Sequence, residues 1–273
     1  MLLDLKYLLS HLPPNVDKRD AFLLIQYTLK INYEKLFFIK EIEITVQEFD
    51  KLMECIQLRS EHMPIAKIIG HKSFYNNEFK TTTDTLDPRP ETELIIDLFL
   101  KYFPNRAVPL SILDLGCGTG CIGLSILDFY KNSTLCLADI SDKALSVAKY
   151  NAKNLNLENR CSFTKTSWFN DVKGKFNAIV CNPPYVEDNY DLDRDTLYDP
   201  PIALFGGKDG LDAYKKILPY TKQFLCDKGF LFLEIGLGQS EAVCRIAEDL
   251  DTIEIAKDLQ GINRIIVFSI NSI

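Results

Sequence analysis

The sequence FNAIVCNPPY, residues 176–185, ends an apolar segment with an asparagine, two prolines and a tyrosine. The prolines stiffen the turn and have no backbone N–H, so the carbonyl of Pro183 is left as a hydrogen-bond acceptor. That carbonyl and the side-chain oxygen of Asn182 form a pair of acceptors suited to the two hydrogens of an NH2 group. Tyr185 can lie against the flat face of such a group and exclude water.

An NH2 group held in this way is prepared to attack an electrophilic carbon. The planar nitrogen of a side-chain amide or of a base amine is a poor nucleophile because its lone pair is delocalised. Two acceptors at roughly 2.7–3.2 Å can orient the lone pair and stabilise the positive charge that develops on the N–H bonds. Positioning supplies most of the effect, because the proton becomes acidic as the N–C bond forms and no strong base is needed.

A second segment with chemical potential is the glycine-rich LDLGCGTG at residues 113–120. Glycines permit a tight turn and let a ligand approach the backbone closely. The glycines at 118, 120 and 123 also satisfy the pattern GxGxxG, so this loop alone does not distinguish a dinucleotide from an adenosyl ligand.

An acidic residue follows at the end of the next predicted strand. Asp139 stands in LADIS, 25 residues after Asp114. A carboxylate there can accept hydrogen bonds from both ribose hydroxyls of an adenosine. The alternative is that Asp139 only caps the helix expected to begin near Asp142.

The elements that position these residues are predicted from the alternation of strands and helices after Ser111. The expected strands are short and nearly all apolar, and they are SILDL, TLCLADIS, CSFTKTSW, FNAIVCN, GFLFLEIG, TIEIAKDL and NRIIVFSI. This pattern predicts an α/β domain with a largely parallel sheet covered by helices on both faces. Ligands of such sheets bind at the carboxyl ends of strands, so the glycine loop and Asn182 are expected in one cleft.

The first part of the chain, residues 1–71, has helical periodicity and is expected to be a small all-helical module. Its opening MLLDLKYLLSHLPP reads as an amphipathic helix, and Asp17 can cap the next one. Thr45 and Glu48 form the capping box of a third helix, which Pro64 is expected to close. The module is too short to hold a large core alone, so we expect it to dock on another surface.

A linker and the catalytic domain are expected to follow. Residues 72–87 contain Asn76-Asn77 between aromatic residues, which indicates a β-hairpin linker. Residues 88–273 are expected to form the third part, in which DPRPETE gives an extended approach to a helix from Glu91 to about Phe103.

Composition excludes several classes of protein. The net charge of -7 and the pI near 5.1 disfavour a nucleic-acid binder, which needs a basic surface. No apolar run approaches the ~20 residues of a membrane span, and no signal peptide is recognisable. The eight cysteines include no CxxC pair and there are only three histidines, so we expect reduced cytoplasmic cysteines and no metal site.

The motifs together resemble a known family. NPPY with LDLGCGTG is similar to amino-methyltransferases that use S-adenosyl-L-methionine. Further blocks resemble, in the same order, the HemK/PrmC family of protein glutamine N5-methyltransferases, namely GHKSF, LDPRPETE, ADIS, NPPYV, YDPPIALFGGKDGLDAY, FLEIGLGQ and NRIIVF. The resemblance covers essentially the whole chain, and DPRPETE and ALFGGKDGLDAY are its most specific parts.

The resemblance implies a fold and an activity. The fold is that of a class I S-adenosylmethionine-dependent methyltransferase, Rossmann-like with a mostly parallel seven-stranded sheet. The activity is methyl transfer from S-adenosyl-L-methionine to N5 of the glutamine in the GGQ motif of class I peptide chain release factors, with S-adenosyl-L-homocysteine as product. The protein is expected to act as a monomer on this protein substrate, which residues 1–71 would recognise, without contacting nucleic acid or membrane.

The resemblance also implies roles for individual residues. The cofactor would be held by Gly116, Cys117, Gly118, Thr119 and Gly120 at its methionine part, Asp139 at the ribose, Trp168 at the adenine and Asn182 near the methyl donor. The substrate glutamine would be held by Asn182, Pro183, Pro184 and Tyr185, with Arg89 and Pro90 at the border of the pocket. The expected catalytic residues are Asn182, Pro183 and Tyr185. Ser167 departs from the family, because many relatives have an acid there that contacts the adenine amino group.

Three of these residues have structural alternatives. Trp168 can be a core residue, and Tyr185 can simply pack on the end of the sheet. Arg89 can be an ion-pair partner of Glu91 or Glu93.

Three other functions compete with release factor methylation. One is the related methylation of a glutamine in a large-subunit ribosomal protein, although ALFGG after YDPP resembles the release-factor branch more closely. Another is amino-methylation of a nucleic acid, which the acidic charge disfavours. The last is a non-catalytic domain that binds an adenosyl ligand, which would not need the NPPY motif.

Overall fold

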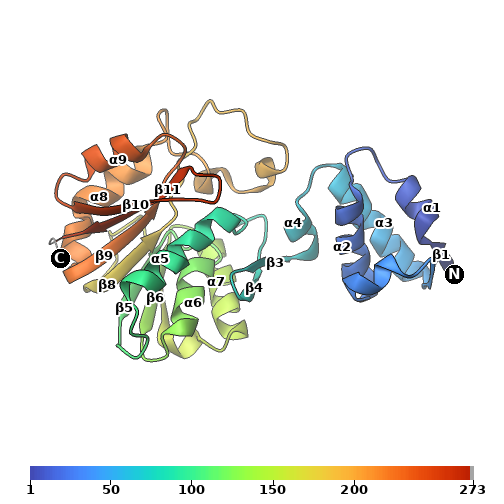
Figure 1. Ribbon diagram of the computed structural model, residues 1–273, viewed down its shortest axis with the longest axis horizontal. Coiled ribbons are helices and arrows are strands. Elements are labelled where there is room, and N and C mark those ends of the chain that lie inside the picture. Colours follow the sequence, from blue (N-terminus) through green and yellow to red (C-terminus); the bar gives the residue numbers. More distant parts are fainter. Residues whose placement is uncertain (271–273) are drawn as a thin grey trace. The chain divides into compact units, whose positions relative to one another are not determined.

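The computed structural model describes residues 1–270, and the chain divides into two compact units (Figure 1). The first consists of Met1–His71 together with the distant segment Leu192–Tyr198. The second consists of Lys72–Asp191 and the chain from Asp199 onward.

The first unit is mainly helical. Its elements are β1 (Leu2–Asp4), α1 (Leu5–Ser10), α2 (Lys18–Leu29), a 3-10 turn (Tyr33–Phe37), β2 (Glu41–Glu43), α3 (Val46–Ser60) and α4 (Ile65–Ile69). Asp17 caps α2 by accepting from the N–H of Asp20, and Thr45 and Glu48 form the predicted capping box of α3. Apolar side chains from these helices form a core of their own, which includes Leu24 and Leu52.

Three details of this unit differ from the prediction. The module is not all-helical, because β1 pairs antiparallel with β2, with Leu3 opposite Ile42. The first helix is shorter than expected, because Asp4 belongs to β1 and caps α1 through the N–H of Tyr7. Pro64 does not close α3, which ends at Ser60, but instead stands directly before α4.

Segment Leu192–Tyr198 belongs to the first compact unit, whereas the expected boundaries include it in residues 88–273. Asp195 forms ion pairs with Arg59 at 3.0 Å and His62 at 3.4 Å, and the hydroxyl of Tyr198 donates to the carbonyl of Glu61 at 2.8 Å. These polar contacts hold the segment in the first unit. Sequence reasoning missed them because they join residues more than 130 positions apart.

The second unit contains the predicted seven-stranded sheet. Its strands are β5 (Ser111–Leu115), β6 (Thr134–Asp139), β7 (Cys161–Lys165), β8 (Phe176–Cys181), β9 (Leu225–Glu234), β10 (Asp251–Lys257) and β11 (Asn263–Ser269). The spatial order is β10-β11-β9-β8-β5-β6-β7. Strands β5 to β9 run parallel, and β11 is antiparallel to both of its neighbours. The glycine loop follows β5, Asp139 ends β6 and Asn182 follows β8, so all three lie at the edge where these parallel strands end.

Alternation of side chains along the strands gives the sheet two buried faces. In β8, Ala178 and Val180 belong to one core cluster, whereas Ile179 and Cys181 belong to the other. The first cluster lies under α5 (Leu94–Tyr102), α6 (Cys121–Phe129) and α7 (Asp142–Asn154). The second lies under α8 (Asp212–Phe224) and α9 (Ser240–Ile246).

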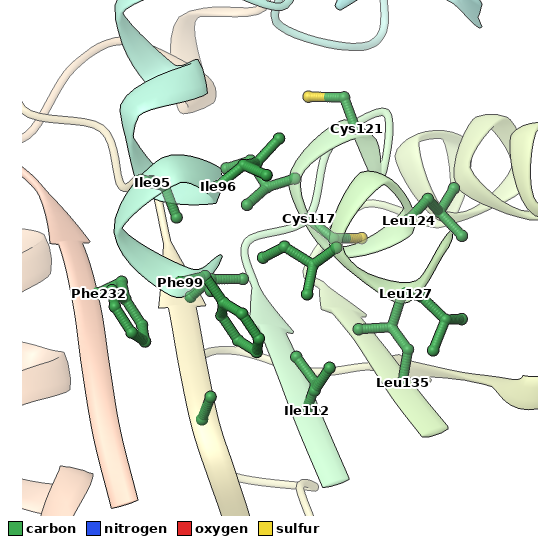
Figure 2. Packing of buried hydrophobic residues seen from close by; sticks show 14 of the residues in the cluster. Ile95, Ile96, Phe99, Ile112, Cys117, Cys121, Leu124, Leu127, Leu135 and Phe232 are labelled. Atoms are coloured by element: carbon green, nitrogen blue, oxygen red, sulfur yellow. The ribbon is translucent and has the colours of Figure 1, made fainter. Parts of the chain in front are cut away.

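The first cluster fixes α5 and α6 against the sheet, as Figure 2 shows. Phe99 of α5 and Phe232 of β9 are both fully buried, with ring centroids 5.4 Å apart. Leu124 and Leu127 of α6 pack in the same cluster with Ile112 of β5. This packing determines where the glycine loop between β5 and α6 lies.

The predicted hairpin consists of β3 (His71–Phe74) and β4 (Asn77–Lys80), which form a two-stranded sheet. Tyr75 takes a left-handed conformation at the turn, with φ of 55°. After the hairpin, a 3-10 turn (Pro90–Glu93) leads into α5, close to the helix start expected from DPRPETE.

Candidate active site

A cavity of about 320 Å³ lies at the carboxyl edge of the parallel strands in the second unit. This volume is in the range of small-molecule sites. Four groups of residues line it: the segment from Asp84 to Arg89 with Thr92; the glycine loop; the residues that follow β6, β7 and β8; and the loop and helix between Pro200 and Lys216.

The glycine loop approaches the cavity with its backbone. Gly116, Gly118 and Gly120 have φ values of 74°, 54° and 77°, a backbone region that residues other than glycine rarely adopt. A Cβ added to Gly118 would meet nothing within 4 Å, so this position faces open space. Cys117 and Thr119 also line the cavity.

Gly120 has a different role, because it is not among the lining residues. It stands directly before α6, and an added Cβ would lie 3.0 Å from Cδ2 of Leu137 and 3.1 Å from Cδ1 of Leu124. Its contribution is therefore to the turn and to the packing of the helix against the sheet.

Asp139 lines the cavity and also holds the glycine loop. Its Oδ2 accepts from the N–H of Gly118 at 2.9 Å, and its Oδ1 accepts from the N–H of Ser141 at 2.9 Å. Burial raises the pKa of the carboxyl group, and these backbone hydrogen bonds act in the opposite direction. The side chain of Ser141, not that of Asp139, caps α7 by accepting from the N–H of Ala144, which argues against the helix-cap alternative.

Asp114 lies beneath the glycine loop in the core. Its Oδ2 accepts from the N–H of Gly123 at 2.9 Å, and burial raises the pKa of its carboxyl group to about 8. A Cβ at position 123 would lie 2.8 Å from Oδ2 of Asp114. The third glycine of the GxGxxG pattern therefore allows the helix to approach the strand and does not line the cavity.

Trp168 is half-buried, lines the cavity and packs partly against the second core cluster. A Cβ on Gly116 would lie 3.7 Å from Cζ3 of its ring, so the ring lies beside the glycine loop. Its φ of 53° and the hydrogen bond from the hydroxyl of Thr166 to its carbonyl hold this turn. Trp168 thus lies both at the edge of the core and in the wall of the cavity, the two positions that were predicted as alternatives. Ser167 is exposed and also lines the cavity.

Asn182 lines the cavity directly after β8. Its side-chain NH2 donates to the hydroxyl oxygen of Thr92 at 3.2 Å. This bond fixes the orientation of the amide and leaves its Oδ1 as the free acceptor. Within residues 1–270, no protein donor bonds that oxygen or the carbonyl of Pro183.

The other residues of NPPY divide into two groups. Pro184 lines the cavity, whereas Pro183 and Tyr185 are not among the lining residues. The hydroxyl of Tyr185 donates to Oε1 of Glu234 at 3.1 Å, and its ring packs against the second core cluster. Burial, with Glu234 nearby, raises the pKa of Tyr185. In this structure Tyr185 packs at the end of the sheet, and its contact with substrate stays a prediction.

Arg89 lines the cavity as expected, but Pro90 does not. The ion-pair partner of Arg89 is neither Glu91 nor Glu93. Instead, Nη2 of Arg89 lies 2.6 Å from Oδ2 of Asp199, whose side chain is 1% exposed. The sequence did not reveal this pair, because Asp199 is 110 residues away.

Thr92 and Glu234 are the other residues that sequence reasoning missed. Glu234 had a recognisable signal, because it ends the apolar strand FLFLE in the same way that Asn182 follows β8. Thr92 had none, since its contact with Asn182 depends on how the turn before α5 packs against the sheet.

The cavity fits an adenosyl ligand. The open space at Gly118 and the Asp139 carboxylate suit a ligand with a backbone-bound part and a hydroxylated sugar, and the Trp168 ring offers an apolar face. Among residues 1–270 there is no group of three or more His, Cys, Asp or Glu side chains that could hold a metal ion. In that same range, no helix has the length and apolar character to cross a bilayer.

Comparison with known families agrees with this geometry. Residues 3–70 match the family described as PrmC N-terminal domain, and residues 94–198 match the family described as Methyltransferase small domain. The release factor glutamine methyltransferase of Coxiella burnetii is 35% identical, in an alignment that covers 91% of this chain and 90% of the relative. The chain belongs to the release factor glutamine methyltransferase family. The resemblance to HemK/PrmC is thereby confirmed.

A second group of relatives is much longer than this chain. A protein of Rickettsia bellii named bifunctional methyltransferase is 35% identical, in an alignment that covers 97% of this chain but 53% of that protein. The chain spans about half the length of this relative and of the other Rickettsia relatives it matches.

A solved methyltransferase structure has a fold similar to that of this chain. The methyltransferase from Pyrococcus furiosus superposes with a TM-score of 0.54 at 16% identity, covering 82% of this chain and 98% of that chain. The predicted class I S-adenosylmethionine-dependent methyltransferase fold is confirmed.

Proposed function

We propose that the protein transfers a methyl group from S-adenosyl-L-methionine to the side-chain nitrogen N5 of the glutamine in the GGQ motif of class I peptide chain release factors. The product of the cofactor is S-adenosyl-L-homocysteine. The observation that carries the proposal is the orientation of Asn182: its NH2 group is bound by Thr92, so its Oδ1 is available to accept a hydrogen bond from a substrate amide. The family to which the chain belongs supports the choice of a glutamine.

When bound, S-adenosyl-L-methionine supplies an electrophilic methyl group on a sulfonium. Around it, the backbone of Gly116–Thr119 would approach the methionine part, and Asp139 would accept from the ribose hydroxyls. Each oxygen of Asp139 accepts one backbone N–H, and a carboxylate oxygen can accept a second hydrogen bond. Trp168 would cover the adenine.

Asn182 Oδ1 and the Pro183 carbonyl would hold the two N–H groups of the substrate glutamine. As the N–C bond forms, positive charge on the nitrogen strengthens both hydrogen bonds, so the acceptors stabilise the transition state more than the ground state. The glutamine nitrogen would lose one proton to water, with S-adenosyl-L-homocysteine as the leaving group. Arg89, held by Asp199, would border the substrate on the other side of the cavity.

Residues 1–71 would recognise the body of the release factor, and the protein would act as a monomer in the cytoplasm. The acidic net charge supports a protein substrate over a nucleic acid.

The experiment that tests the proposal incubates the protein with methyl-labelled S-adenosyl-L-methionine and a purified class I release factor. Ribosomal proteins and DNA are offered in parallel reactions. We expect mass spectrometry to place one label on the GGQ glutamine and none on DNA. A label found only on a ribosomal protein or on DNA would replace the proposed substrate.

A further inference from the structure

Glu234 is a buried carboxyl group directly behind the NPPY motif. It is the last residue of β9, and its side chain is in the core with the residue 1% exposed. Leu233 pairs with Cys181 of β8, so Glu234 lies one position further along, beside Asn182 at the same sheet edge. Burying a carboxylate costs folding free energy unless it is hydrogen-bonded or paired, and a leucine or glutamine would fill the same space at a lower cost.

One oxygen of this carboxyl group holds Tyr185. The hydroxyl of Tyr185 donates to Oε1 at 3.1 Å. Because Pro183 and Pro184 make the intervening chain stiff, fixing Tyr185 at one end also restricts the position of the Pro183 carbonyl.

The carboxyl group of Glu234 also interacts with the residue that orients Asn182. Thr92 is 2% exposed, and its hydroxyl oxygen accepts from Asn182. The Thr92 hydroxyl lowers the pKa of Glu234, and Oε2 of Glu234 has no hydrogen-bond partner among the described residues. The hydroxyl hydrogen of Thr92 and the unpaired Oε2 are thus a donor and an acceptor that complement each other.

We infer that Glu234 is a positioning residue of the acceptor pair: its carboxylate holds Tyr185 directly and Asn182 through the hydroxyl of Thr92. The inference rests on the proposed function, because it assigns how the two acceptors for the substrate amide are kept in place. Glu234 does not line the cavity, so it acts only through these neighbours.

The charge state of Glu234 matters for this role. Only the carboxylate offers acceptors to both hydroxyls. Burial raises the pKa of the group to about 7, so it titrates near neutral pH. The titratable groups that interact with it are Glu91, Cys121, Cys181, Tyr185, Tyr214 and Arg264.

The test is steady-state methylation of intact release factor by the full-length enzyme and its Glu234→Gln variant. Glutamine keeps an acceptor for Tyr185 but presents an NH2 group toward Thr92. We expect kcat to fall roughly tenfold or more, with the dissociation constant for S-adenosyl-L-methionine unchanged within about twofold, since lost positioning acts on the transition state. The wild-type kcat should also decline as pH falls through about 7, and this decline should be absent in the variant.

Tyr214→Phe is the matched control. The hydroxyl of Tyr214 lies 3.2 Å from the backbone carbonyl oxygen of Glu234 and 3.2 Å from Oε1 of Gln239, so this variant loses buried hydrogen bonding beside Glu234 and leaves the Glu234 carboxyl group in place. It should lower the melting temperature and leave kcat and its pH profile as in the wild type. Thr92→Val should reproduce most of the loss of kcat seen in Glu234→Gln. The double variant Thr92→Val/Glu234→Gln should lose little more kcat than Glu234→Gln alone.

Two results would overturn the inference: wild-type kcat in Glu234→Gln, or a parallel loss of cofactor binding and kcat in Glu234→Gln and Tyr214→Phe. Failure of the proposed function would appear differently, as absence of glutamine methylation by the wild-type enzyme itself.

Discussion

The backbone N–H of Gly118 donates to Oδ2 of Asp139 at 2.9 Å, which joins the loop after β5 to the end of β6 at the wall of the cavity. One carboxylate thus shapes the loop that would hold one part of the cofactor, and the same carboxylate would contact the ribose. A change at Asp139 is therefore expected to affect cofactor binding in two ways, through the lost ribose contacts and through the loop.

Replacing Asp139 by alanine should weaken binding of S-adenosyl-L-methionine roughly 5- to 150-fold, because unpaired ribose hydroxyls cost ~1–3 kcal/mol. Isothermal titration calorimetry measures this directly. Ser141→Ala is the matched control, since it removes the cap of α7 and leaves the carboxylate in place. Unchanged affinity in Asp139→Ala would return the residue to a purely structural role.

Asn182→Ala should reduce methyl transfer to the release factor by roughly 100-fold or more, the size of effect seen when a group that stabilises developing charge is removed. Asn177, at the other end of β8, provides the control: its Oδ1 accepts from the N–H of Ser111 at 2.8 Å. Asn177→Ala should lower stability but keep the turnover rate. Near-normal turnover in Asn182→Ala would remove the acceptor-pair mechanism.

Gly123→Ala should destabilise the fold, although alanine at a helical position normally stabilises by about 1 kcal/mol relative to glycine. The added Cβ would lie 2.8 Å from Oδ2 and 2.9 Å from Cβ of Asp114, and 2.9 Å from Cδ1 of Leu135. We expect the free energy of unfolding in urea to fall by about 1–3 kcal/mol. A higher free energy of unfolding in Gly123→Ala would mean that α6 can move away from β5 and β6 without loss of stability.

The carboxyl group of Asp114 should make stability depend on pH. Burial raises its pKa from 3.8 to about 8, so between these values the folded state retains a proton that the unfolded state has lost. Its contribution to stability is present below pH 3.8 and is lost as the pH rises through about 8.

The difference between Asp114→Asn and the wild type isolates this contribution. As the pH rises from about 4 to 8, the wild type should become less stable relative to the variant, by at most about 1.4 kcal/mol per pH unit. Urea unfolding at several pH values measures it. A difference that does not vary with pH would place the pKa of Asp114 in its ordinary range.

Deletion of Met1–Gly70 should raise the KM for intact release factor and leave cofactor affinity unchanged, if the module recognises the protein substrate. The deletion also removes the partners of segment Leu192–Tyr198. A variant with Asp195→Ala and Tyr198→Phe loses the same contacts but keeps the module, and should retain a normal KM. Equal kinetics of the truncated and intact enzymes would refute the recognition role.

The sequence determined the catalytic fold because its signals are local. The strands after Ser111 are short and apolar, the glycines recur where the backbone must turn, and Asp139 and Asn182 stand at strand ends. Parallel strands place their carboxyl ends at one edge, so these residues could be expected in one cleft before any contact was known. The capping box of α3 is equally local, with both partners within four residues.

Only the tertiary structure decided which neighbours complete the site. Thr92 orients Asn182 across 90 positions, Asp199 binds Arg89 across 110, and Glu234 holds Tyr185 across 49. Only the tertiary structure also shows that Pro183 and Tyr185 do not line the cavity. It likewise shows that segment Leu192–Tyr198 belongs to the first unit. Local pattern sets backbone conformation and burial, whereas the pairing of buried polar groups depends on which surfaces the folded chain brings together.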